Sequence, residues 1–126
     1  MTADEGVRRL VLHTTPGSAS FLGMLRPYRG LEQQVLADVS DSLKAAAPKI
    51  SDEHLPRELV SAVWAISYYG RWWALDPEGM LRRNNLISDA DLTTLARFLE
   101  WFDYAVSALL QGGGNQAAFD ENPFQW

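Results

Sequence analysis

The segment from Ser88 to Gly114 restricts the fold more than any other part of the chain. Ser88 is a good N-cap, and Asp91 places a carboxylate at the positive end of the helix that would follow. Apolar residues then recur at alternating spacings of three and four, at Leu92, Leu95, Leu99, Phe102, Val106 and Leu109. Three glycines at 112–114 stop the pattern. Because this apolar seam spans fewer than three heptads, it predicts a helix packed in a bundle rather than an extended coiled coil.

Two further helices are predicted upstream. Apolar residues recur at helical spacing on one face between Gly30 and Ala47, and Pro48 is expected to end that helix. Another helix opens in the segment 51–56 and continues to about Leu75. It is apolar on two sides, which is typical of the central helix of a bundle, so Trp64 is expected in the core with Phe102. The segment 76–79 has the composition of a type I turn.

The predicted fold class is therefore all-α, a small single-domain helical bundle with three main helices. The N-terminal portion is less certain, since residues 7–13 suit a strand or a helix equally, and a short helix is expected over 19–26. A length of 126 residues suits one domain. We expect the bundle to occupy residues 1–111, and residues 112–126 to form a glycine-rich and then aromatic, acidic tail.

The residue types present argue against most catalytic chemistry. The chain has no cysteine, which excludes thiol nucleophiles, zinc fingers and disulfides, and its two histidines lie in no metal-binding motif. Glu100 and Asp103 are neighbouring carboxylates, but they are expected on a hydrated outer face, where general acid–base catalysis is poorly served. We expect no enzyme activity, no cofactor and no metal. An acidic N-terminus and short apolar runs predict a cytoplasmic protein without a membrane partner.

The net charge of −5 belongs to one end of the sequence. Residues 1–83 hold ten acids and ten bases, whereas residues 84–126 hold six acids against Arg97 alone. Such a surface repels nucleic acid and attracts a basic protein, although a solvated helix face is its more ordinary explanation.

Aromatic residues near these acids supply candidate anchors, because tryptophan and tyrosine dominate binding hot spots. The predicted partner-binding set is Asp89, Asp91, Glu100 and Asp103 for steering, with Trp72, Trp101 and Tyr104 as anchors. The segment 70–85, which carries two tryptophans and three arginines, suits either a recognition loop or a rigid connector, and we favour the connector.

In its size, acidic last helix, aromatic content and lack of a catalytic set, the chain resembles the small, acidic, cysteine-free helical immunity proteins that accompany secreted or polymorphic antibacterial toxins. The resemblance implies tight binding to a basic toxin and coverage of the toxin's active site or another essential surface. Two alternatives stay open. One is a small-ligand-binding or regulatory bundle with a pocket lined by Trp64, Tyr68, Tyr69 and Phe98. The other is a structural homodimer that buries the seam and the tail aromatics.

Overall fold

The computed structural model describes residues 1–17 and 19–126, and within them the chain is helical with no β-strand. The elements, in chain order, are α1 (Ala3–Leu12), α2 (Phe21–Leu25), α3 (Gln33–Ile50), α4 (Arg57–Gly70), the π-helical turn η1 (Arg71–Leu75), α5 (Met80–Arg83), α6 (Asp89–Leu110) and the π-helical turn η2 (Gln116–Asp120). The all-α prediction is confirmed. None of the described helices combines the length and the apolar character that crossing a bilayer requires.

The prediction of three main helices is wrong in number, because α1 is a fourth helix of the bundle in addition to α3, α4 and α6. The Thr2 hydroxyl caps it by accepting a hydrogen bond from the Glu5 N–H at 3.1 Å. Its inner face packs closely on α3 at Gly6, where a Cβ would lie 2.7 Å from the Ser42 carbonyl oxygen. This long-range packing selects the helix over the strand, which local spacing alone leaves undecided.

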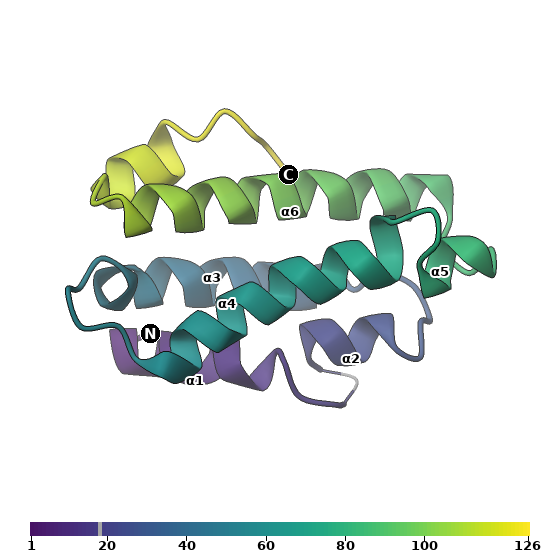
Figure 1. Cartoon of the computed structure of the whole chain (residues 1–126), viewed down its shortest axis with the longest axis horizontal. Helices are drawn as coiled ribbons and strands as arrows, with labels where there is room; N and C mark the ends of the chain where they lie inside the picture. The colour runs from purple at the N-terminus through teal and green to yellow at the C-terminus, as the bar shows by residue number, and fades with distance from the viewer. Residues whose placement is uncertain (18) are drawn as a thin grey trace.

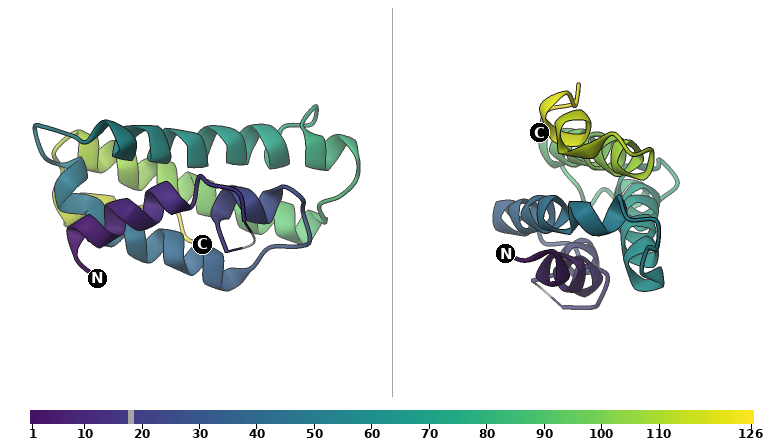
Figure 2. Two further views of the ribbon diagram at one scale, coloured as in Figure 1. Left: turned by 90° about the horizontal axis from the view of Figure 1, so that it is seen from below. Right: turned by 90° about the vertical axis from the view of Figure 1, so that its left-hand side faces the viewer.

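The long helices are arranged in layers (Figure 1). The end-on view in Figure 2 places α3 between α6 on one side and α1 on the other, with α4 alongside. Both α3 and α4 contact α1, α2 and α6, and each keeps an exposed face, so the expectation that α4 is enclosed on two apolar sides is wrong. The fully buried side chains of the core include Leu10, Phe21, Leu36, Leu43, Leu59, Ile66, Phe98 and Phe102.

Several local predictions can be compared directly with the helix boundaries. The Ser88 hydroxyl accepts the Asp91 N–H at 3.1 Å and caps α6, as predicted. The Gly79 N–H donates to the Asp76 carbonyl oxygen at 2.8 Å, which confirms a turn there. Pro48 does not end α3, which continues to Ile50 and closes with the Ser51 N–H donating to the Ala47 carbonyl oxygen at 3.0 Å. Proline removes the one bond that its own N–H would have donated, and the residues after it still donate to earlier carbonyls.

The C-terminal segment folds back along α6 (Figure 1). The buried Asn122 side chain donates from Nδ2 to the carbonyl oxygens of Trp101, at 3.1 Å, and Ala118, at 3.0 Å. The Trp126 ring meets the Phe98 ring edge-on, with the ring centroids 4.9 Å apart. Residues 112–126 are thus packed against the bundle and cover one side of α6.

Candidate functional site

The predicted acidic residues divide into two pairs. Asp89 and Glu100 lie exposed on α6, without an ion pair to any described residue. Asp91 accepts a hydrogen bond from the Tyr28 hydroxyl at 2.7 Å. Asp103 accepts hydrogen bonds from Nε and Nη2 of Arg71, so its charge is largely neutralised within the chain. Of the four acids, only Asp103 has its charge balanced by a cation of the described chain; Asp91 stays charged but has one oxygen occupied by Tyr28.

The contact between Tyr28 and Asp91 stabilises the fold and does not form part of a catalytic group. Burial raises the pKa of the Tyr28 hydroxyl far above its ordinary value, and the hydrogen bond and negative charge of Asp91 add to that rise. The phenol therefore stays protonated and keeps donating to the carboxylate. This bond ties the loop before α3 to the first turn of α6.

Trp101 is not available as an anchor. Its side chain is 6% exposed and lies among Phe98, Phe119 and Trp126. The C-terminal segment supplies two of these three rings, and the helical spacing of α6 does not reveal that cover. The expectation that Trp101 contacts a partner is therefore withdrawn. Tyr104, which is more exposed, keeps an accessible edge beside Phe124.

Trp64 is the opposite case, because it was expected in the core and is 55% exposed. It belongs to a line of half-exposed side chains on the outer side of α4 and η1, which we call the aromatic stripe: Val60, Trp64, Tyr68 and Trp72. The members are four residues apart, so they form one ridge along the helix surface. The Trp64 and Tyr68 rings stack at a centroid distance of 4.6 Å and an interplanar angle of 9°.

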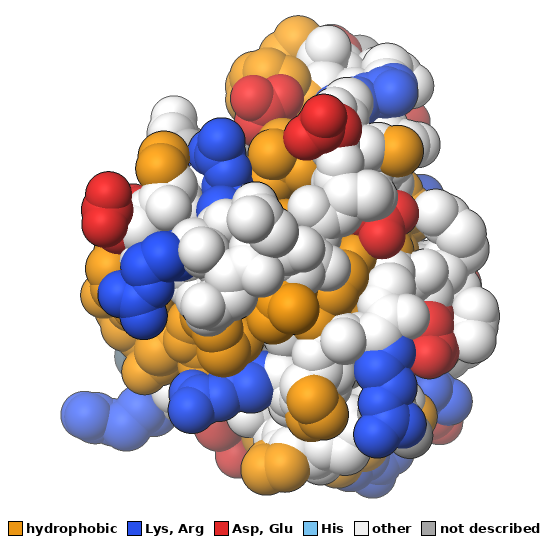
Figure 3. All heavy atoms as spheres, turned by 90° about the vertical axis from the view of Figure 1, so that its right-hand side faces the viewer, with side chains coloured by type: hydrophobic (Ala, Val, Ile, Leu, Met, Phe, Trp, Pro, Cys, Tyr) orange, Lys and Arg blue, Asp and Glu red, His pale blue; other side chains and the backbone are white. Residues whose placement is uncertain are grey.

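A shallow hollow lies at each end of the aromatic stripe. The first is lined by Leu55, Arg57, Val60, Ser61 and Trp64, and the second by Tyr68, Arg71, Trp72, Leu75 and Asp76. The first hollow therefore carries the basic Arg57, and the second carries Asp76 together with Arg71, whose charge is paired with Asp103. Figure 3 shows the end of the molecule where α5 lies, with apolar side chains gathered between basic and acidic ones.

The segment that follows α4 holds Trp72 in place. Gly79 approaches the Trp72 carbonyl so closely that a Cβ would lie 2.0 Å from its oxygen. Arg82 donates from Nη1 to the Leu75 carbonyl oxygen at 3.0 Å, and Arg71 is held by Asp103. These contacts tie the segment to α6 and to its own backbone, as a connector requires, and leave Trp72 at the outer surface, where a recognition role stays open.

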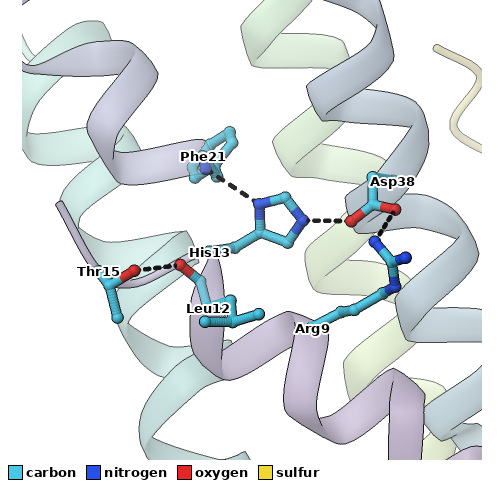
Figure 4. A network of polar contacts seen from close by, with 6 residues as sticks. All are labelled: Arg9, Leu12, His13, Thr15, Phe21 and Asp38. Atoms are coloured by element: carbon cyan, nitrogen blue, oxygen red, sulfur yellow. Dashed lines mark hydrogen bonds and ion pairs between the residues drawn. The ribbon is translucent and has the colours of Figure 1, made fainter. Parts of the chain in front are cut away.

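The described residues bring one histidine and one carboxylate together, at His13 and Asp38 (Figure 4). The His13 ring, 3% exposed, accepts the Phe21 backbone N–H at Nδ1, at 3.0 Å. An acceptor nitrogen carries no proton, so Nε2 is the protonated one and donates to Asp38 at 2.7 Å. Arg9 pairs with the other oxygen of Asp38 at 2.9 Å.

Both ring nitrogens of His13 are thus occupied, and neither is free to take a proton from a substrate. The network instead joins α1, α2 and α3 through the buried His13 ring, with the pair of Arg9 and Asp38 at its exposed side. Among residues 1–17 and 19–126, no group of three or more His, Cys, Asp or Glu side chains is placed to hold a metal ion.

The pocket expected from a ligand-binding bundle is not formed by its predicted residues. Phe98 is fully buried and contacts Phe21 and Phe102, whereas Trp64 and Tyr68 stack on the outer surface. These side chains therefore do not line a common cavity.

The sequence signal for the aromatic stripe is that α4 is apolar on two sides. This pattern predicts burial on both sides, but the structure leaves one of them exposed. No family model, curated protein or solved structure matches the chain, so the site rests on the geometry described above.

Proposed function

We propose that the protein is a non-catalytic protein-binding module and that the aromatic stripe is its contact surface. The observation that carries the proposal is the alignment of Val60, Trp64, Tyr68 and Trp72, each between 45% and 55% exposed, on one helical ridge. Isolated exposed apolar residues are ordinary on soluble proteins, but a contiguous group of this kind is typical of an interaction surface. Two tryptophans and a tyrosine are also the residue types that contribute most to hot spots.

The charge next to the aromatic stripe favours a basic partner. The ion pair between Arg71 and Asp103 joins the stripe to α6, whose exposed acids include Glu100. The negative charge of residues 84–126 lies largely on that helix and its tail, so it attracts a basic protein toward this side. In its most specific form, the proposal is a cytoplasmic immunity protein that neutralises a basic toxin by covering an essential surface.

The decisive experiment compares capture of a partner by three versions of the chain. The wild type, a Trp64→Glu variant and a Leu12→Glu variant are used as bait in lysate of the source cells, and any captured protein is purified and titrated against each version. Leu12 is an equally exposed apolar residue on α1 and serves as the matched control. We expect the control to bind as the wild type does and Trp64→Glu to lose at least about a hundredfold in affinity, the scale of a hot-spot residue.

Retention of the partner by Trp64→Glu with unchanged affinity would overturn the stripe as the contact surface. The acidic contribution is tested separately with Glu100→Lys. We expect that variant to slow association and to reduce its dependence on salt, with little change in the dissociation rate.

A further inference from the structure

We propose that in the free protein the aromatic stripe is covered by the aromatic stripe of a second copy, with the two α4 helices antiparallel about a two-fold axis. The inference rests on the proposed function, because the same surface then serves both contacts. Self-association and partner binding exclude one another, and the partner displaces the second copy.

The spacing of the aromatic stripe is self-complementary in this arrangement. A two-fold axis at the level of Ile66 places residue 64 opposite residue 68 of the second copy, and residue 60 opposite residue 72. Trp64 then meets Tyr68, and the small Val60 meets the large Trp72. An isologous interface requires this kind of matching, since one surface must fit itself.

The charges at the two ends of the aromatic stripe set the direction of pairing. Arg57 begins α4 and lines the hollow at one end of the stripe, whereas Asp76 follows η1 and lines the hollow at the other end. Antiparallel pairing therefore brings Arg57 of each copy to Asp76 of the other, at both ends of the interface. Parallel pairing would oppose like charges at each end.

The other charged group lining the hollows does not disturb this matching. Arg71 is already paired with Asp103 in its own chain, so it contributes no unpaired positive charge to the interface. Two antiparallel helices that cross at a shallow angle of about +20°, the class found in helix bundles, stay in contact along their length, as the pairing of both ends requires. Spacing and charge thus agree on the second copy as the occupant.

The first test measures mass in solution by sedimentation velocity and light scattering, with no lysate present. We expect the wild type to move from one chain mass, 14.1 kDa, to twice that mass as its concentration is raised through the micromolar range. Tyr68→Glu is expected to stay monomeric at every concentration, because it buries two uncompensated charges beside the axis. Leu12→Glu is expected to dimerise as the wild type does.

The second test addresses direction and register. Arg57→Glu opposes two pairs of like charges and is expected to weaken the dimer roughly tenfold, while the double variant Arg57→Glu/Asp76→Arg is expected to recover most of that loss. Asp76 also accepts the Glu78 N–H in the turn, so the thermal unfolding of each variant is recorded to show that it remains folded.

A wild type that remains monomeric through the millimolar range would overturn the pairing, as would a Tyr68→Glu variant that still dimerises. Failure of the double variant to recover dimerisation while folded would overturn the antiparallel register. These outcomes are separate from the proposed function. If the wild type is monomeric and its Trp64→Glu variant no longer binds the partner, the pairing alone is refuted. If the protein dimerises through the stripe but Trp64→Glu captures the partner as well as the wild type does, the partner-binding role alone is refuted.

Discussion

The aromatic residues of α6 and those on the outer side of α4 are chemically alike but differ in what covers them. Beside α6, the rings of Phe98 and Trp101 are covered by Phe119 and Trp126 from the C-terminal segment. The Lys44 amine adds a cation–π contact, 5.9 Å from the centroid of the Trp101 ring. On α4, no described segment lies over the aromatic stripe, and its four members stay about half exposed.

The difference shows that residue type alone does not separate a core aromatic from a binding aromatic. Both sets lie on amphipathic helices, and each contains a tryptophan close to a charged neighbour. What separates them is a segment of fifteen residues, 112–126, that folds back along one helix and not the other. The tail covers one aromatic surface and leaves the aromatic stripe exposed, which is the surface that we propose binds another molecule.

The largest expected effect is the loss of the covered tryptophan. Trp101→Ala removes a ring that is 6% exposed and leaves a cavity beneath the tail, so we expect it to lower the free energy of unfolding by roughly 3–5 kcal/mol. Urea denaturation followed by far-ultraviolet circular dichroism measures the change. Trp101→Phe, which keeps an aromatic ring, should lose distinctly less. A loss below about 1 kcal/mol in the alanine variant would mean that the tail does not cover α6 in solution.

The next effect concerns the polar group that fastens the tail. Asn122 donates to the Trp101 and Ala118 carbonyl oxygens and accepts the Phe124 N–H at 3.0 Å, all near the covered rings. Asn122→Ala removes these three hydrogen bonds from a buried position and is expected to cost about 1–3 kcal/mol of unfolding free energy. Gln116→Ala, which removes an exposed bond to Glu121, is the control and should change stability little. Hydrogen exchange should also show faster opening of residues 116–126 in the first variant.

A smaller effect on the free energy of unfolding is expected at Tyr28, a partly buried aromatic residue whose hydroxyl donates to Asp91. Its pKa is raised mainly by burial, so the folded state holds the phenolic proton more tightly than the unfolded state, in which tyrosine titrates at about pH 10. The stabilisation is complete below that pH and is lost as the pH rises toward the folded-state pKa. Unfolding free energies measured from pH 7 to pH 11 should therefore decline more for the wild type than for Tyr28→Phe. Parallel declines would contradict the assignment.

The smallest effect on stability is expected in the aromatic stripe itself. Trp64→Ala loses an exposed stacking contact of roughly 0.2–0.5 kcal/mol with Tyr68 and gains helix propensity, so the free energy of unfolding should change by less than about 1 kcal/mol. The same substitution at Trp101 is the matched comparison. If Trp64→Ala proved as damaging as Trp101→Ala, the stripe would be part of the core, and both the proposed function and the pairing would lose their basis.

Local sequence signals predicted the parts of the structure that depend on neighbouring residues. The N-cap at Ser88 and the seam through Leu95, Leu99 and Phe102 predict α6 without any knowledge of the segments that pack on it. The turn at 76–79 was predicted from its composition in the same way. The π-helical turn η1 carries no comparable signal, because it depends on how the chain leaves α4 for the connector.

The candidate site was only partly predictable for the same reason. Trp72 and Tyr104 are exposed as expected. Trp64, which is expected in the core, is exposed, and Trp101, which is expected at the surface, is buried. Helical spacing tells which side chains share a face, but it does not tell which face another segment will cover. Trp101 is buried by rings at positions 119 and 126, and nothing within its own helix reveals them.

By itself, the sequence determined the three long helices after residue 30, the boundaries of the last of them and the uneven distribution of the charge. Each follows from residues within one or two helical turns, where spacing, capping and side-chain charge act directly. The tertiary structure alone decided that α1 is a helix against α3, that the tail covers α6 and that the outer side of α4 is left bare. These features depend on contacts between residues far apart in the chain, whose stability comes from apolar area removed from water only once the segments meet.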